Sequence, residues 1–259
     1  MLDIEQITSF YPENLQPYKK NLLREYLQFK ILEAIYDSEW GGKLVFMGGT
    51  AIHLVHGNTR FSEDLDFDNV GLNKHNFTSM VNAILTFLKR SGYKAESRNV
   101  FGQAFRSYMK FSDVLFQAGL SGHRLEKLNI QIDTEPQKLK YEPEKVILNK
   151  FDVFTKISVV PADLLLSQKL HCILARPRPL GRDFYDAVFL FGKTQPNIDY
   201  LKDKIGTTTL TDLKDQLIKR CSEVDLKKLV KDIDPFLYEP GGAKKILHFC
   251  EFIKSRLPN

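Results

Sequence analysis

The chain of 259 residues has only three cysteines, and it has no long hydrophobic run. Cys172, Cys221 and Cys250 stand far apart without a CxxC or metal-ligand spacing, which predicts reduced, buried thiols and excludes a disulfide scaffold. No apolar stretch approaches the roughly 20 residues that span a bilayer. The first residues, MLDIEQITSF, lack the basic and apolar pattern of a secretion signal. These features predict a soluble, cytoplasmic protein without a membrane partner.

The sequence also lacks a large excess of positive or negative charge. The formal net charge is +5, and Lys and Arg are mixed with Asp and Glu over most of the length. The net charge is therefore weak evidence for an anionic partner. The sequence contains no internal repeat or low-complexity segment, which excludes repeat architectures and leaves ordinary globular domains.

The hydrophobic pattern predicts an α+β fold. Apolar residues at steps of three and four predict helices over 16–38 and 76–92, and a shorter helix is expected over 50–57. Short apolar or alternating segments predict strands over 44–48, 64–68, 107–112 and 126–133. After Pro161 the pattern turns helical, with a break at PRPLG. We expect an α/β domain with a mixed sheet over residues 1–150 and a mainly helical domain over 151–259.

Three acids alternate in the segment DLDFD. Residues two apart in a strand share a face, so Asp64, Asp66 and Asp68 should point one way while Leu65 and Phe67 point to the core. Neighbouring like charges repel and raise one another's pKa unless a cation lies among them. Mg²⁺, or Mn²⁺ in its place, prefers such oxygen ligands. The alternative is a strand end whose acids are only solvated.

A glycine pair precedes these acids. Gly48, Gly49 and Thr50 lie between a predicted strand and a predicted helix, where a phosphate could approach the bare backbone N–H groups. Most glycine pairs are only turns. This pair is one short helix away from the acid cluster, so a phosphate cradle and a metal site would share a pocket.

Asp133 ends the alternating segment EKLNIQID. If this strand pairs beside DLDFD, Asp133 would bring a third oxygen ligand to a two-metal centre. Otherwise Asp133 caps a turn.

These motifs carry a resemblance to a known family. GGT, thirteen residues and then DLD is similar to the signature of the nucleotidyltransferase superfamily, which has the DNA polymerase beta-like fold. The fuller pattern, FMGGTAIHLVHG with RFSEDLDF and later KLHCILAR with GRDFYDAVFL, resembles the AbiEii/AbiGii toxin family. The similarity covers roughly residues 40–195. Leu65 departs from it, because some relatives have an acid there, and around Asp133 only the strand and its final acid match.

The resemblance implies a metal-dependent enzyme that transfers a nucleoside monophosphate from a nucleoside triphosphate to an acceptor hydroxyl. The resemblance and the residue chemistry together assign three groups. The metal ligands are Asp64, Asp66 and Asp133, the triphosphate is held by Gly48, Gly49 and Thr50, and the nucleotide is bound by Lys169 and Arg182. The resemblance also implies that Asp186 faces the active site and acts with Lys169 and the three metal ligands in catalysis.

The segment KLHCILARPRPLGR, residues 169–182, contains four Lys or Arg and no acid. It offers a local positive field for triphosphate or RNA phosphates. Arg182 and Asp186 are spaced for an i,i+4 ion pair, and Asp183 could cap its helix. Arg176 and Arg178 either contact RNA or are merely solvated.

His53 and His56, three residues apart, could mimic a metal pair, but we interpret them as partly exposed helix residues. The resemblance further implies a tRNA 3′ end as the acceptor, and a DNA-binding repressor as the cognate antitoxin. Two alternatives stay open. One is a small-molecule nucleotidyltransferase that modifies an antibiotic such as an aminoglycoside, which an acidic substrate surface would suit. The other is a non-catalytic nucleotide- or RNA-binding module, which has no need for paired carboxylates.

Overall fold

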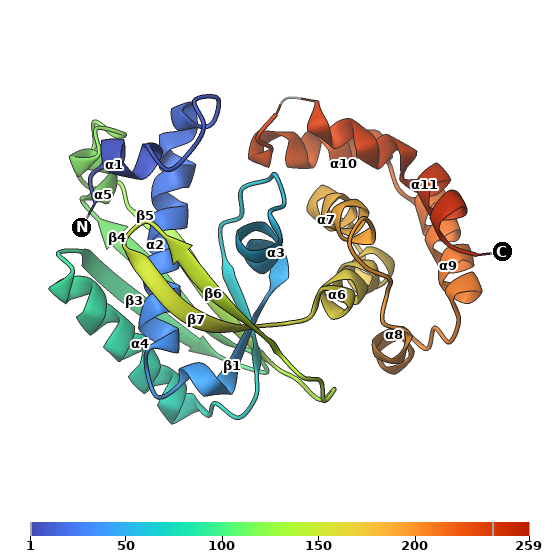
Figure 1. The fold of residues 1–259 in the computed structure, drawn as a ribbon, viewed down its shortest axis with the longest axis horizontal. Coiled ribbons are helices and arrows are strands. Elements are labelled where there is room, and N and C mark those ends of the chain that lie inside the picture. The colour runs from blue at the N-terminus through green and yellow to red at the C-terminus, as the bar shows by residue number, and fades with distance from the viewer. Residues whose placement is uncertain (1, 240, 259) are drawn as a thin grey trace. The chain divides into compact units, whose positions relative to one another are not determined.

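The structure, a computed structural model, describes residues 2–239 and 241–258 (Figure 1). These residues divide into two compact units, residues 2–51 with 62–159 and residues 52–61 with 160–258. The first unit carries the sheet and the second is helical, so the predicted α+β class is confirmed. The last strand, β7, is counted with the first unit because it pairs with two other strands. The predicted division into domains 1–150 and 151–259 stays a prediction.

The described residues of the first unit form one mixed sheet of seven strands, in the order β3-β4-β5-β2-β1-β7-β6. β2 runs parallel to β5, and β1 runs parallel to β7, whereas the other neighbours are antiparallel. The four predicted strands are present, and three more were not predicted, β3, β6 and β7. The strand bounds are β1 Leu44–Met47, β2 Leu65–Asn69, β3 Lys94–Phe101, β4 Phe105–Ser112, β5 Leu128–Pro136, β6 Glu144–Lys150 and β7 Val153–Val159.

Alternation along the strands gives the sheet two faces. One face packs against α2 (Lys19–Tyr36) and α4 (Lys74–Arg90), which lie alongside the strands in Figure 1. Phe46 and Phe67 are fully buried on this face with ring centroids 5.4 Å apart, and burying each such side chain contributes about 1.5–3 kcal/mol. We call the opposite face the polar face. Alternation places Asp66 and Asp133 there, because Leu65 and Ile132 point to the core.

The remaining helices of the first unit are short. α1 spans Ile4–Thr8, α5 spans Val114–Gln117, and 3₁₀ turns cover Gln16–Tyr18 and Gly41–Lys43. α3 spans Gly48–His56, with residues 48–51 counted in the first unit and 52–56 in the second, and it starts two residues before the predicted helix and follows β1 without a loop.

The second unit consists of helices, as predicted after Pro161, which is the N-cap residue of α6. Of the helices described in the chain, none combines the length and hydrophobicity needed to cross a bilayer. The bounds are α6 Ala162–Ala175, α7 Gly181–Phe191, α8 Ile198–Ile205, α9 Leu210–Glu223, α10 Leu226–Ile233 and α11 Phe249–Arg256, with 3₁₀ segments at Asp234–Phe236 and Gly242–His248.

The three cysteines are free thiols, as predicted. Only Cys221 is fully buried, and burial raises the pKa of its thiol to about 12. Cys172 and Cys250 are partly exposed, so the prediction of burial was wrong for these two.

Candidate active site

Gly48 joins β1 to α3 and lies directly against an acid of the neighbouring strand. Its φ of 77° falls in the left-handed region, which a residue with a Cβ rarely adopts. A Cβ placed at Gly48 would lie 2.9 Å from Cβ and Cγ of Asp66, and closer still to Oδ2. Glycine at this position therefore serves two purposes, because it permits the turn and lets the Asp66 carboxylate lie against the start of α3.

The parallel pairing of β2 with β5 sets Asp66 opposite Asp133. Opposite residues of adjacent strands point to the same face, so both carboxylates project from the polar face. Gln131 Nε2 donates to Oδ2 of Asp133 at 2.7 Å, and Arg106 Nε lies 3.2 Å from Oδ1. The pairing on which the hypothesis for Asp133 depended is thus present.

Asp64 was predicted to begin the strand of the other acids, and the strand starts one residue later. β2 begins at Leu65, so Asp64 lies just before the strand, where no alternation applies. Its backbone carbonyl accepts a hydrogen bond from the hydroxyl of Thr50, which is fully buried. The preceding segment is also fixed, because Gln28 Nε2 donates to the carbonyls of Ser62 and Glu63 at 3.0 Å each.

Asp68 follows the predicted alternation but is not a solvated acid. It is 2% exposed, and its Oδ2 accepts hydrogen bonds from Gln137 and Tyr141. Asp68 is therefore part of the packed structure beside the candidate site.

The carboxylates of the polar face suit an oxygen-preferring cation. Oδ1 of Asp133 is buried and makes no hydrogen bond with the residues that the structure describes, and its partner is the ion-paired guanidinium of Arg106 at 3.2 Å. Within those residues, no group of three or more His, Cys, Asp or Glu side chains is arranged as a ready metal site. Mg²⁺ is commonly held by one or two carboxylates together with substrate phosphates. The pair Asp66 and Asp133 fits that pattern.

The second unit contains a buried cluster of charges around Asp186, which has no exposed surface. Arg60 donates through Nε and Nη2 to the two carboxylate oxygens at 2.6 Å each. Asn58 Nδ2 donates to Oδ1 at 2.7 Å, and Lys169 Nζ lies 3.0 Å from Oδ2. Lys169 also pairs with Asp183 at 3.2 Å, so one lysine joins two acids of α7.

The groups of this cluster hold each other in the charged state. Burial opposes the charge of Lys169, but Asp186 and Asp183 outweigh burial and raise its pKa above the ordinary value. Burial would likewise raise the pKa of Asp186, yet Arg60 and Lys169 bring it below the ordinary value. Lys169 and Asp186 are therefore both charged across the neutral range.

The structure decides three possibilities that the sequence left open in this region. Arg182 is exposed, and among the described residues it makes no ion pair, so the pair with Asp186 is absent. The reason is that Asp186 faces the interior, where Arg60 occupies both of its oxygens. Asp183 does not cap α7 but is buried and pairs with Lys169 and Arg176. Arg176 is hence not merely solvated, since its Nη1 lies 3.0 Å from Asp183.

The two histidines of α3 have separate surroundings. His53 is 8% exposed, with Nδ1 2.6 Å from the carbonyl of Asn58 and Nε2 3.1 Å from the hydroxyl of Tyr238. The prediction of partial exposure was wrong for His53. His56 is half-buried, and its burial lowers its pKa.

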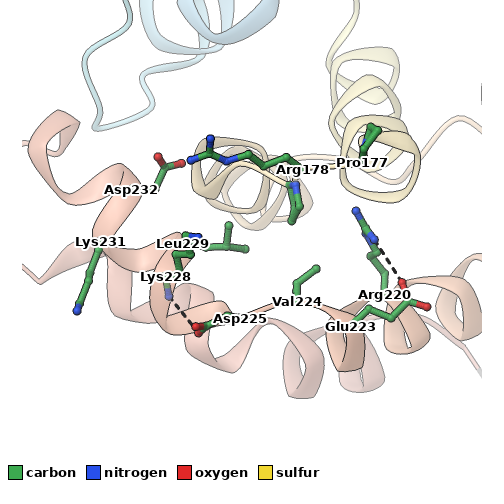
Figure 2. Close-up of a pocket in the computed structure, with 11 residues that line it drawn as sticks. Pro177, Arg178, Arg220, Glu223, Val224, Asp225, Lys228, Leu229, Lys231 and Asp232 are labelled. Carbon is green, nitrogen blue, oxygen red and sulfur yellow. Dashed lines mark hydrogen bonds and ion pairs between the residues drawn. The ribbon is translucent and has the colours of Figure 1, made fainter.

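A pocket of about 490 Å³ lies elsewhere in the second unit, between the loop before α7 and helices α9 and α10 (Figure 2). Figure 2 shows Arg178 extending toward Asp232, and Arg220 pairs with Glu223 at 3.3 Å. The lining of this pocket contains both cations and acids. None of its residues was predicted to be catalytic, to bind a metal or to bind the nucleotide.

Sequence reasoning missed Arg60 and Asn58. Both stand in the segment between the glycine pair and the acids, and Arg60 begins the motif RFSEDLDF. A buried acid needs a compensating cation, but Arg60 is 126 residues from Asp186, so no local spacing could reveal the pair.

Replacing Gly48 by Ala should destabilise the chain for two reasons, backbone strain of about 1–2 kcal/mol and the collision with Asp66. Gly57→Ala is a matched control, because Gly57 has a φ of 78° and no atom within 4 Å of an added Cβ. Urea denaturation should show a larger loss for G48A than for G57A, and adding Asp66→Ala, which removes Cγ and Oδ2 but keeps Cβ, should recover part of the difference. Equal losses for the two glycine variants would show that Asp66 does not press on this position.

Replacing Asp186 by Ala should cost about 3–5 kcal/mol of unfolding free energy, because it leaves Arg60 and Lys169 buried without their shared partner. Asp215→Ala on the exposed side of α9 is the control and should change stability little. The pKa of Asp186 is lowered by folding, so its contribution is present above about pH 4 and disappears as pH falls through the folded value. A D186A variant as stable as D215A at pH 7 would contradict the cluster.

Known proteins share this sequence pattern and fold. A family model described as "Nucleotidyl transferase AbiEii toxin, Type IV TA system" matches residues 30–241. Two solved structures from Helicobacter pylori have a TM-score of 0.57 and 18% identity. One is JHP933, with 91% of each chain covered, and the other is provisionally assigned as a nucleotidyltransferase, with 91% of this chain and 93% of that chain covered. No curated protein matches.

The structural likeness, at 18% identity, shows the fold alone. The family match extends over most of the chain and includes the glycine pair, the acids of β2 and the buried cluster of α6 and α7. Its description makes the protein a nucleotidyltransferase, which implies a nucleoside triphosphate as substrate and an antitoxin as partner. This chain therefore belongs to the AbiEii nucleotidyl transferase toxin family of type IV toxin–antitoxin systems.

Proposed function

We propose that this nucleotidyltransferase joins a nucleoside monophosphate to a terminal hydroxyl of RNA, with the 3′ end of tRNA as the acceptor. The observation that carries the proposal is the register of β2 and β5, which sets Asp66 beside Asp133 on one face of the sheet. Gly48 brings the backbone of α3 directly against the same carboxylate. The N-terminus of a helix attracts a phosphate, and the neighbouring carboxylates can bind the cation that accompanies it.

In this proposal, Asp64, Asp66 and Asp133 hold Mg²⁺ or Mn²⁺, which when bound would offset the negative charge of the triphosphate. Asp66 and Asp133 have the better support, because they are opposite each other in the sheet. Asp64 lies next to Asp66 along the chain, and its backbone is held by Thr50.

Gly48, Gly49 and Thr50 bind the triphosphate through their backbone. The hydroxyl of Thr50 is buried and already donates to the carbonyl of Asp64, and of the three residues Gly48 is the one that is partly exposed. The first N–H groups of a helix have no acceptor within the helix and attract anions.

In this proposal, Lys169, Asp186 and Arg182, which belong to the second unit, are the further catalytic and nucleotide-binding residues. Arg60 and Lys169 are buried and balance the two acids Asp183 and Asp186, and Arg176, whose side chain is 38% exposed, adds one positive charge in excess. This excess favours a phosphate group. We propose that Lys169 binds this phosphate, with Asp186 keeping the lysine charged and in place. Arg182 is exposed, so its guanidinium is free of the buried cluster and in this proposal binds the nucleotide.

Exposed arginines in the segment 176–182 favour a polyanionic acceptor over a cationic antibiotic. Both RNA and nucleoside triphosphates are present in the cytoplasm, where we propose that the protein acts. We further propose that its antitoxin is a DNA-binding repressor, as the family resemblance implies.

Asp66→Asn and Asp133→Asn should each lower the rate of nucleotide transfer by about a hundredfold or more, because each removes a charge that the site needs. Stability should be unchanged or higher for D66N, because repulsion between the acids is relieved, whereas D133N also weakens the partly exposed pair with Arg106 and should lose at most about 1 kcal/mol. The measurement is incorporation of each labelled triphosphate into total tRNA with Mg²⁺, with Asp215→Asn as the control.

Two outcomes would contradict the proposal. Wild-type incorporation by D66N would remove Asp66 from the site. Labelling of an aminoglycoside, with no labelling of tRNA by any of the four triphosphates, would replace the acceptor by a small molecule.

A further inference from the structure

Strands β3, β4 and β5 bring an aromatic ring and several cations together on the polar face. β4 pairs antiparallel with both neighbours, and opposite residues point to the same side. The register therefore builds three rows across the strands. These rows are Glu96, Lys110 and Asn129, then Arg98, Tyr108 and Gln131, and then Val100, Arg106 and Asp133.

Tyr108, at the centre of these rows, is unusually open for an aromatic residue in a middle strand. It is 36% exposed, and its side chain makes no hydrogen bond or ring contact with any residue that the structure describes. Val100 beside it is 40% exposed. A planar apolar surface in such a position is available for a flat ligand.

The cations around Tyr108 exceed the acids. Arg98 and Lys110 are exposed and form no ion pair within the described residues. Lys127 pairs with Glu96, and Arg106 pairs with Asp133. Four cations are thus present with two acids. Of the two cations without an ion pair, Arg98 lies in the row of Tyr108 and Lys110 lies in the neighbouring row.

The third row leads to the candidate active site. Arg106 is opposite Asp133, and Asp133 is opposite Asp66 on the far side of β5. Strands lie about 4.8 Å apart and alternate residues about 6.8 Å apart, so the Cα atoms of Tyr108 and Asp133 are separated by roughly 8 Å. A strand of nucleic acid that reaches the carboxylates can hence also reach Tyr108.

We propose that Arg98, Tyr108 and Lys110, with Arg106, form a platform that binds the single-stranded 3′ end of the acceptor RNA. A base stacks on Tyr108, phosphates lie near Arg98 and Lys110, and the terminal hydroxyl comes to Asp66 and Asp133. Proteins that bind single strands without reading sequence combine aromatic stacking with a positive surface in this way. The excess positive charge disfavours a cationic antibiotic. The platform rests on the proposed function, because it presumes an RNA acceptor.

The test of stacking is the affinity of the full chain for a fluorescent single-stranded oligoribonucleotide with a free 3′ hydroxyl. Tyr108→Ala should weaken binding about fivefold to a hundredfold, while Tyr108→Phe keeps the ring and should bind nearly as well as the wild type. Phe116→Ala removes an aromatic residue that is 45% exposed on α5 and should have no effect. Affinity for nucleoside triphosphate should be the same in all four proteins.

The test of the cations is the salt dependence of the same binding. Replacing Arg98 and Lys110 together by Ala should flatten the slope of log affinity against log salt by about 1.4, which is two phosphate contacts to a single strand. The matched control replaces Lys89 and Arg90, which are exposed on α4 against the other face of the sheet, and should leave the slope unchanged.

Failure of the platform and failure of the proposed function look different. If the wild type labels RNA and Y108A binds and labels it equally well, the platform is wrong while the function stands. If the wild type neither binds nor labels RNA but transfers nucleotide to a small molecule, both are wrong.

Discussion

The parallel pairing of β2 with β5 is the constraint on which the candidate site depends. It sets Asp66 opposite Asp133, and the core holds this register, because Leu65 and Ile132 are opposite each other on the buried face. A slip of one residue would turn every side chain of a strand to the other face, so burial of the apolar residues also determines where the carboxylates lie. The strand register that packs the core therefore also determines the positions of the carboxylates on the polar face.

Asp66 and Asp186 differ in burial and in how their negative charge is compensated. Asp66 is half-buried on a sheet, where it can be replaced without opening the core. Asp186 is fully buried and compensated by Arg60 and Lys169, so removing it leaves uncompensated charge in the interior. Loss of activity is therefore evidence of a catalytic role for Asp66, whereas for Asp186 the same loss has to be separated from loss of fold.

Local patterns predicted much of the fold and failed where partners are distant. β2 and β5 were predicted because apolar residues alternate with polar ones, but every residue of β3 is at least partly exposed, so it lacks that signal. The helix spacing rule paired Arg182 with Asp186, yet that rule describes exposed helix surfaces, and Asp186 faces inward. Arg60 was missed because its partner is 126 residues away. The glycine pair was interpreted as a place of close approach, and at Gly48 it is the Asp66 side chain that makes this approach.

The central claim is that Asp66 and Asp133 together bind the cation that accompanies the triphosphate. The most direct measurement is anomalous diffraction from crystals of the wild type that contain Mn²⁺ and a non-hydrolysable nucleoside triphosphate. The account predicts a manganese peak within about 2.0–2.3 Å of oxygens from both carboxylates, with further ligands from the phosphates. A peak that contacts neither Asp66 nor Asp133, with the nucleotide bound, would contradict it.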